Sequence, residues 1–153
     1  MHHPLDARGP GDGVTRRLAD VQVGTELPEQ STRVTRADLV RYAGASGDFN
    51  VIHWNDRVAR EVGLPGVIAH GMLTAGIAAR AVTAWAGDPG AVVEYQVRFS
   101  RPVVVPDDGE GAELTVRGRV AAVAEDGRVR VDLTVTSGGE KVLSLARAFL
   151  ALS

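Results

Sequence analysis

The spacing of apolar residues changes once along the chain, near residue 91. Before that point, apolar positions recur at helical spacing, which predicts helices after Thr35, after Asn55 and over about residues 70–85. After it, apolar and polar residues alternate, which predicts β-strands with one buried face. The pattern therefore predicts a helical first half followed by an antiparallel meander.

The helix predicted for about residues 70–85 is apolar nearly all round. A helix of this kind belongs in the interior of a domain. The alternating strands cover about residues 93–99, 114–122, 129–135 and 141–152. A sheet with one apolar face can wrap such a helix. The predicted fold class is therefore α+β, with a curved antiparallel sheet around a long central helix.

Local signals support the predicted ends of these elements. Thr35 is followed three residues later by Asp38, as in a capping box, and Asn55 is a typical N-cap residue. The sequences Asp126-Gly127 and Ser137-Gly138-Gly139 predict tight turns between strands.

Composition narrows the class of protein. A length of 153 residues predicts one domain, and a net charge of −2 argues against a nucleic-acid-binding protein of this size. The absence of cysteine excludes a disulfide scaffold, a thiolate nucleophile and a cysteine zinc site. We expect a reducing, cytoplasmic location.

The first 17 residues are rich in Gly, Pro, Asp and Arg and show no apolar periodicity, which predicts a disordered N-terminal extension before a domain over residues 18–153. Residues 67–86 are long enough to span a bilayer, but they include His70 and Arg80, and most of their apolar residues are alanine. A buried helix of a soluble protein is the favoured interpretation, with no membrane partner.

Candidate chemistry is concentrated between the first two predicted helices and the start of the third. Asp48 precedes His53 by five positions, so a regular helix would point the two side chains about 140° apart. Gly47 and Asn50 favour a bent loop instead, and a bend can bring the two together. A carboxylate beside an imidazole is suited to proton transfer near neutral pH.

Plainer interpretations compete with this one. Asp48 is a common turn residue, and His53 can be a packed histidine bonded to backbone. A metal site formed by Asp48, His53 and His70 is a further alternative, but the helix-start position of His70 suits a capping role better. We predict neither a metal nor a cofactor.

Two motifs carry a resemblance to a known family. Residues 42–53 (YAGASGDFNVIH) resemble the hydratase signature of the MaoC-like, (R)-specific enoyl hydratase family, and residues 68–74 (IAHGMLT) resemble its second hallmark. The resemblance covers about residues 21–152 and implies the hotdog fold. Further matches, including residues 85–92 (WAGDPGAV), are similar to the catalytic subunit of two-subunit (3R)-hydroxyacyl-ACP dehydratases.

The resemblance also implies an activity, that of a hydro-lyase acting on 3-hydroxyacyl and trans-2-enoyl thioesters. Asp48 and His53 would be the catalytic pair and would hold one water or the leaving hydroxyl, with the acid and base roles left open. Gly71 would offer its backbone N–H to the thioester oxygen. Asn50 belongs to the substrate-binding set, although bracing of the loop is its favoured role.

Some positions leave questions open. The family usually has proline where this chain has Val51, which predicts a looser link between Asp48 and His53. Arg98 and Arg101 are expected to be solvated charges at strand edges. The alternative is that either arginine contacts a phosphopantetheine or an acidic carrier protein.

Two other functions are possible on the same fold. Hotdog thioesterases generally place a carboxylate on the central helix, and residues 70–85 contain no Asp or Glu. A non-catalytic, acyl-binding partner subunit would lack the acid/base pair, which this chain retains. We expect a dimer with a second hotdog subunit; the likeness favours a different partner chain over a second copy. The sequence leaves open the acyl length and the choice between CoA and acyl carrier protein.

Overall fold

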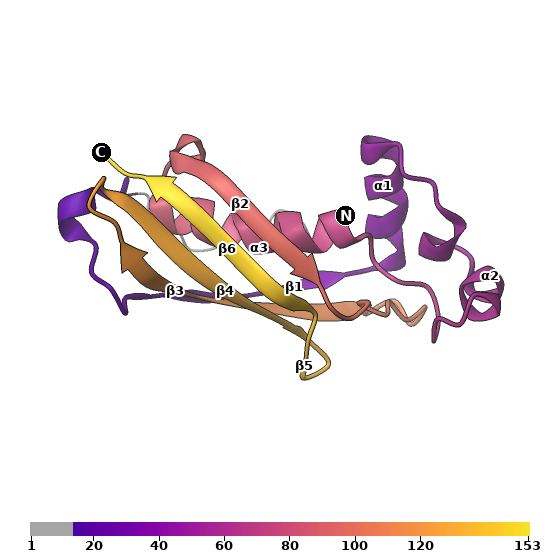
Figure 1. Cartoon of the computed structure of the whole chain (residues 1–153). Coiled ribbons are helices and arrows are strands. Elements are labelled where there is room, and N and C mark those ends of the chain that lie inside the picture. The colour runs from indigo at the N-terminus through magenta and orange to yellow at the C-terminus, as the bar shows by residue number, and fades with distance from the viewer. Residues whose placement is uncertain (1–13) are drawn as a thin grey trace.

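A long helix packs against one face of a curved antiparallel sheet in the computed structural model, which describes residues 14–153 (Figure 1). The elements in chain order are η2 (Leu18–Asp20), β1 (Glu26–Val34), α1 (Arg36–Ser46), η3 (Val51–His53), α2 (Asp56–Glu61), α3 (Gly71–Ala86), η4 (Pro89–Ala91), β2 (Val92–Phe99), β3 (Ala112–Val123), β4 (Arg128–Ser137), β5 (Glu140–Lys141) and β6 (Leu143–Ala151). Helix α3 contacts β1, β2, β3 and β4, so it is the central helix that the sequence predicted.

The order of the strands differs from a simple meander. The sheet has the order β1-β3-β4-β6-β2, with the short β5 paired to β4. Strand β2 therefore pairs with β6 and not with β3, its neighbour in sequence. The predicted meander is wrong at this point, because alternation identifies strands and says nothing about which strands pair.

Residues 100–111 must consequently run from one edge strand back into the sheet. On the way they pair with the segment that leads into α3. Ile68 and Val104 form an isolated bridge, Ala69 N–H donates to the Val103 carbonyl at 2.8 Å, and Val105 N–H donates to the Val67 carbonyl at 2.9 Å. This crossing segment forms one wall of the pocket described below.

The residues predicted to face the core do so in β3 and β4, whereas in β2 part of the predicted face is exposed. Val129, Val131, Leu133 and Val135 of β4 are all buried. In β2, Tyr95 and Val97 pack against the core, but Val93 is exposed and Val92 faces inward in its place. A bulge between Val92 and Glu94 causes the exchange, because one extra residue reverses the alternation of faces.

The predicted helix boundaries agree with the structure. Thr35 and Asp38 form a complete capping box at the start of α1, and α1 ends at Gly47, whose φ of 76° is left-handed. The Asn55 side chain accepts from Val58 N–H at the start of α2.

Residues 1–13 of the predicted extension lie outside the described residues. Residues 14–17 differ from the prediction of disorder, because they contact the end of α3: Arg16 N–H donates to the Ala86 carbonyl, and its guanidinium lies over the Trp85 ring.

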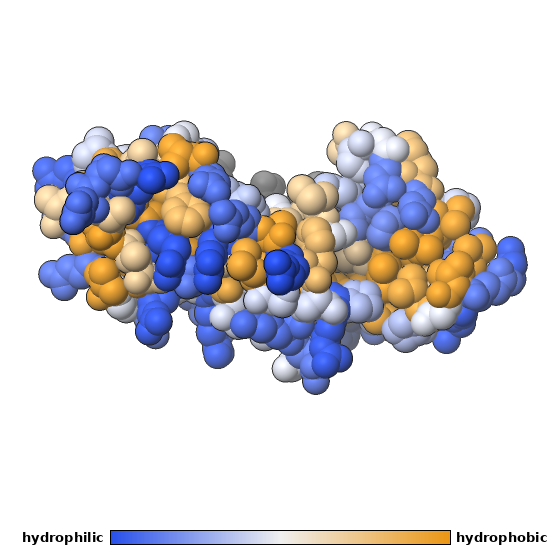
Figure 2. Space-filling view, in the orientation of Figure 1, coloured by the Kyte–Doolittle hydropathy of each residue, from blue (hydrophilic) through white to orange (hydrophobic). Residues whose placement is uncertain are grey.

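The core lies between α3 and the sheet. The inward side chains of α3 include Ile77, Ala81, Val82 and Trp85, all buried. Among the described residues, no helix is long and apolar enough to cross a membrane. Figure 2 shows hydrophilic side chains over the outer face of the sheet and a larger hydrophobic area at the end of the molecule that carries α1 and α2.

Candidate active site

The end of α1, the loop after it and η3 lie against the segment that leads into α3. Two hydrogen bonds join them: Ile68 N–H donates to the Ile52 carbonyl at 3.3 Å, and the Ile68 carbonyl lies 2.8 Å from His53 Nδ1. This contact brings both predicted family motifs to one place.

Asp48 lies in the turn that follows α1. Its N–H donates to Ser46 Oγ at 3.2 Å, and its Oδ1 accepts from Asn50 N–H at 3.2 Å. Its carboxylate is 53% exposed. The turn thus presents a solvated carboxylate whose orientation is set by its own loop.

His53 is the last residue of η3 and is buried. A carbonyl oxygen can only accept, so the contact with Ile68 places the proton of a neutral ring on Nδ1. The lone pair of that ring is therefore on Nε2, which lies 3.9 Å from Asp48 Oδ2. The bent loop expected from the sequence does bring these two side chains together.

His70 joins the pair, in a place that its sequence position did not reveal. It occupies the N-cap position of α3 but makes no side-chain capping bond, so the expected capping role is wrong. Its ring stacks on His53 with centroids 3.7 Å apart, and its Nε2 lies 3.0 Å from the Asp48 carbonyl. The ring of Tyr42 packs against it at a tilt, with centroids 4.8 Å apart.

The same three side chains offer possible metal ligands. One ligand atom from each of Asp48, His53 and His70 lies within 4.8 Å of the others. However, the two imidazole planes are stacked with an angle of 23° between them. The lone pairs of an imidazole lie in the ring plane, so stacked rings direct them side by side and not toward a common ion. The geometry favours proton transfer over metal binding.

Asn50 and Gly71, the two predicted substrate-binding residues, have different surroundings. The Asn50 side chain caps η3 by accepting from Ile52 N–H, which is a loop-bracing role. Gly71 is the first residue of α3, where a backbone N–H has no partner within the helix. An added Cβ at Gly71 would lie 3.0 Å from the Phe99 ring.

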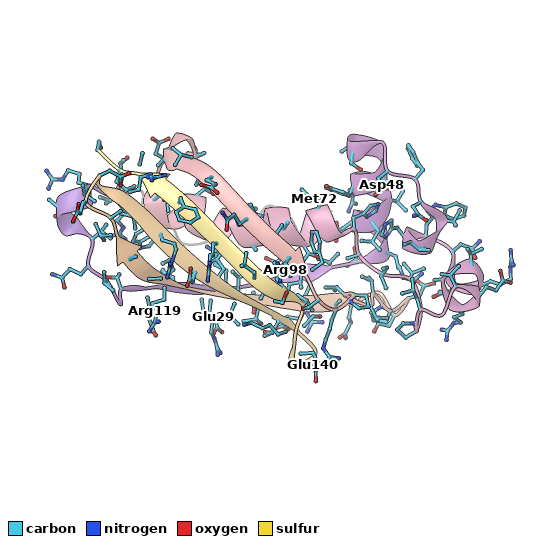
Figure 3. All side chains as sticks on the ribbon, in the orientation of Figure 1. Glu29, Asp48, Met72, Arg98, Arg119 and Glu140 are labelled. Carbon is cyan, nitrogen blue, oxygen red and sulfur yellow. The ribbon has the colours of Figure 1, made fainter. Side chains whose placement is uncertain are left out.

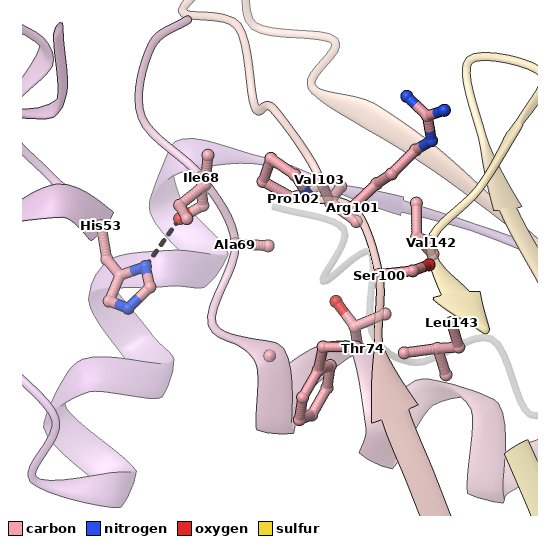
Figure 4. Close-up of a pocket in the computed structure, with 12 residues that line it drawn as sticks. His53, Ile68, Ala69, Thr74, Ser100, Arg101, Pro102, Val103, Val142 and Leu143 are labelled. Carbon is pink, nitrogen blue, oxygen red and sulfur yellow. Dashed lines mark hydrogen bonds between the residues drawn. The ribbon is translucent and has the colours of Figure 1, made fainter. Parts of the chain in front are cut away.

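A pocket of about 280 Å³ opens beside His53 (Figure 4). Gly71 and Thr74 of α3 form one side of it. Phe99 at the end of β2 and Val103 of the crossing segment form another. The full lining is His53, Ile68, Ala69, Gly71, Thr74, Phe99, Ser100, Arg101, Pro102, Val103, Val142 and Leu143. Its walls are mainly apolar, and His53 and Arg101 are the titratable side chains among them.

The remaining candidate residues lie around this pocket. Arg101 lines it and pairs with Glu140 at 3.2 Å, both side chains being well exposed, whereas Arg98 is an exposed residue of β2 (Figure 3). Trp54 is half exposed and donates its indole N–H to the Phe49 carbonyl at 3.1 Å. Figure 3 labels Met72 at the beginning of α3 and Asp48 beside α1.

A family model described as MaoC like domain matches residues 20–138. The chain belongs to the MaoC-like dehydratase family. A solved MaoC-like dehydratase is 44% identical, with a TM-score of 0.87 over 96% of this chain and 44% of that one. The fold is accordingly the hotdog fold of this family, as the sequence motifs implied.

Two curated relatives add the chemistry found in the family. The 3-hydroxyacyl-thioester dehydratase X of Mycobacterium tuberculosis is 40% identical over 98 residues, which are 59% of this chain and 34% of that protein. The (R)-specific enoyl-CoA hydratase of Rhodospirillum rubrum is 30% identical over 133 residues, 86% of this chain and 89% of that one. The chain thus spans about a third of the first relative and most of the second.

Proposed function

We propose that this protein is a hydro-lyase that interconverts (3R)-hydroxyacyl and trans-2-enoyl thioesters. The observation that carries the proposal is the placement of Asp48 Oδ2 and His53 Nε2, 3.9 Å apart beside an apolar pocket. The family relatives, which are named as dehydratases and hydratases, support the same reaction class.

The gap between the two groups suits one small oxygen. It is too long for a direct hydrogen bond, yet one water can lie about 2.8 Å from both atoms. In hydration, that water gives its hydroxyl to Cβ and a proton reaches Cα. In dehydration, one member of the pair removes the Cα proton and the other protonates the departing hydroxyl, so that water and the enoyl thioester leave.

Gly71 supplies the third function in this mechanism. Removal of the Cα proton develops negative charge on the thioester oxygen. The Gly71 N–H points from the first turn of the 16-residue helix α3, where the helix dipole favours negative charge. Asn50 holds the loop and does not contact the substrate in this proposal.

The pocket indicates how the acyl group binds. Ala69, Val103 and Leu143 offer apolar contacts suited to a hydrocarbon chain, and Arg101 stands where the carrier would leave the pocket. We place the CoA or acyl-carrier-protein arm along Arg101. A second hotdog subunit would cover the exposed Phe49 and Met72 beside the site.

The decisive experiment follows hydration of trans-2-enoyl-CoA, short and long, by loss of enoyl absorbance. Asp48→Asn and His53→Gln should each lower kcat by at least about 100-fold, because each removes a proton-transfer group. Asp107→Asn, which changes a loop carboxylate outside the pocket, is the matched control and should retain activity. Full activity in either site variant would reject the pair.

A non-catalytic subunit is the competing function. It predicts that folded wild-type protein is inactive on every acyl length, with either CoA or acyl-carrier-protein substrates, and binds acyl thioesters without turnover. The placement of Asp48 Oδ2 3.9 Å from Nε2 of His53, which lines the pocket, favours the catalytic function.

A further inference from the structure

We infer that His70 is a positioning residue of the site, which holds the Asp48 loop and the His53 ring in their working arrangement. The inference rests on the proposed function for its catalytic consequence. Its structural part, a ring that joins the two halves of the site, stands on the contacts alone.

The first contact is with the Asp48 backbone. The Asp48 carbonyl only accepts, so the ring nitrogen 3.0 Å from it, His70 Nε2, carries the proton and donates. Asp48 also bonds to Ser46 and Asn50, which lie two residues before and after it in the chain. His70 thus anchors a half-exposed loop to the beginning of the rigid helix α3.

The second contact is the stack on His53. The rings lie 3.7 Å apart at 23°, and both are buried. With Nδ1 of His53 held by the Ile68 carbonyl, the stack restricts rotation of the ring about that bond. His53 Nε2 is therefore kept pointing at Asp48, so one residue orients both members of the pair.

The burial of the His70 imidazole with one unpaired nitrogen indicates that its N–H donor has a role in the site. His70 is 1% exposed, and its Nδ1 has no hydrogen-bond partner among the described residues. A buried polar atom without a hydrogen-bond partner destabilises the folded protein. An apolar side chain would avoid that cost while filling the same space. The imidazole therefore makes the folded protein less stable than an apolar side chain would, and what it adds is the N–H that donates to the Asp48 carbonyl.

Three variants separate the donor from the ring. His70→Phe and the smaller His70→Leu keep apolar packing and lose the donor, whereas His70→Gln keeps an N–H donor and loses the ring. Both apolar variants should retain the wild-type Tm within a few degrees. Their kcat should fall on the order of 100-fold, because a small displacement of reacting groups costs that much. KM should change less than about threefold. His70→Gln should recover the part of the rate that the donor contributes, whereas the part that the ring stack contributes stays lost.

A readout independent of activity tests the positioning itself. Hydrogen exchange of the peptide covering residues 44–54 should quicken at least about tenfold in the two apolar variants and remain near wild type in His70→Gln. Val129→Ala, which opens a cavity in β4 where Val129 pairs with Val123 and Leu150, outside the pocket lining, controls for a general loss of stability and should leave that peptide unchanged.

The outcomes are distinguishable. Unchanged kcat in both apolar variants, or an equal loss in His70→Gln, would overturn the positioning role of the donor. If the wild type hydrates no enoyl thioester, the proposed function fails, and the exchange experiment alone decides the inference. Faster exchange in the loop then supports it, and unchanged exchange rejects it.

Discussion

Gly71 has its α-carbon against the ring of Phe99, where a methyl group would lie only 3.0 Å from the nearest ring carbon. The absence of a side chain thus lets α3 begin at the pocket wall, where Gly71 is part of the lining. Phe99 is half exposed, so its ring can shift when pressed.

Gly71→Ala should therefore lower kcat/KM by about tenfold or more while the protein stays folded, because the displaced Phe99 ring narrows the pocket beside the N–H donor. The matched double variant with Phe99→Leu should recover part of the loss. Steady-state kinetics of the two single variants and the double variant would show this coupling, and strictly additive losses would contradict it.

Tyr95 illustrates a stabilising role for a buried hydroxyl. Its O–H donates to the Ala75 carbonyl at 3.0 Å and joins β2 to α3, and burial raises the pKa of Tyr95 to about 12. An unfolded tyrosine has a pKa of about 10. The raised folded value means that the stabilisation is complete below pH of about 10 and is lost as the pH rises through about 12.

Tyr95→Phe should consequently be less stable than the wild type by about 1 kcal/mol at pH 8, since it lacks the hydrogen bond. The difference should shrink as the pH rises above about 10, because only the wild type must then lose a proton on unfolding. Urea unfolding between pH 8 and 11 measures this trend. A constant difference over that range would show that Tyr95 does not ionise on unfolding.

At the scale of elements, the loop from Gly47 to His53 combines a helix end, a turn and one turn of 3₁₀-helix. Val51 is the first residue of η3, and Asn50 before it has φ −55° and ψ 128°. Proline is favoured at the first position of a helix, and the residue before a proline prefers such an extended ψ. The backbone is already compatible with the residue that the family usually has here.

Val51→Pro should thus stabilise the protein by about 0.4–1 kcal/mol, because proline reduces the freedom of the unfolded chain. It should leave kcat within about twofold, since the loop keeps its anchors at His70 and Asn50. Thermal unfolding and enoyl hydration by the same preparation test both parts. A lower Tm would mean that the native loop needs the N–H of Val51.

Interactions between residues that are close in the chain could be predicted from the sequence, and those between distant residues could not. The capping box of Thr35 and Asp38 spans three residues and could be read directly. The contact of His70 with Asp48 joins residues 22 apart, and the Val92 bulge depends on pairing with β6. Neither leaves a periodic signal. The sequence therefore predicted the catalytic candidates and named His70 as a cap or a possible metal ligand, but did not predict its contacts with both of them.

At the scale of the whole molecule, the hotdog arrangement follows from one apolar helix and a sheet with one apolar face. The strand order β1-β3-β4-β6-β2 leaves β1 and β2 at the edges within the described residues. An edge strand has unpaired backbone groups, and β2 also carries the exposed Val93 and Phe99. This edge lies next to the pocket and is a suitable place for the proposed second subunit.

The strand order also has a kinetic consequence. Strands β3 and β4 are joined by the short Asp126–Gly127 turn, whereas β1 pairs with β3 across the whole helical region, and β2 pairs with β6 across the three strands that lie between them in the chain. Contacts between distant segments form late because long loops must close first. The pocket walls come from residues 68–74, 99–103 and 142–143, which meet only after these closures. On refolding from urea, enoyl hydration should return more slowly than the far-ultraviolet circular dichroism, and recovery of both at one rate would indicate a single concerted step.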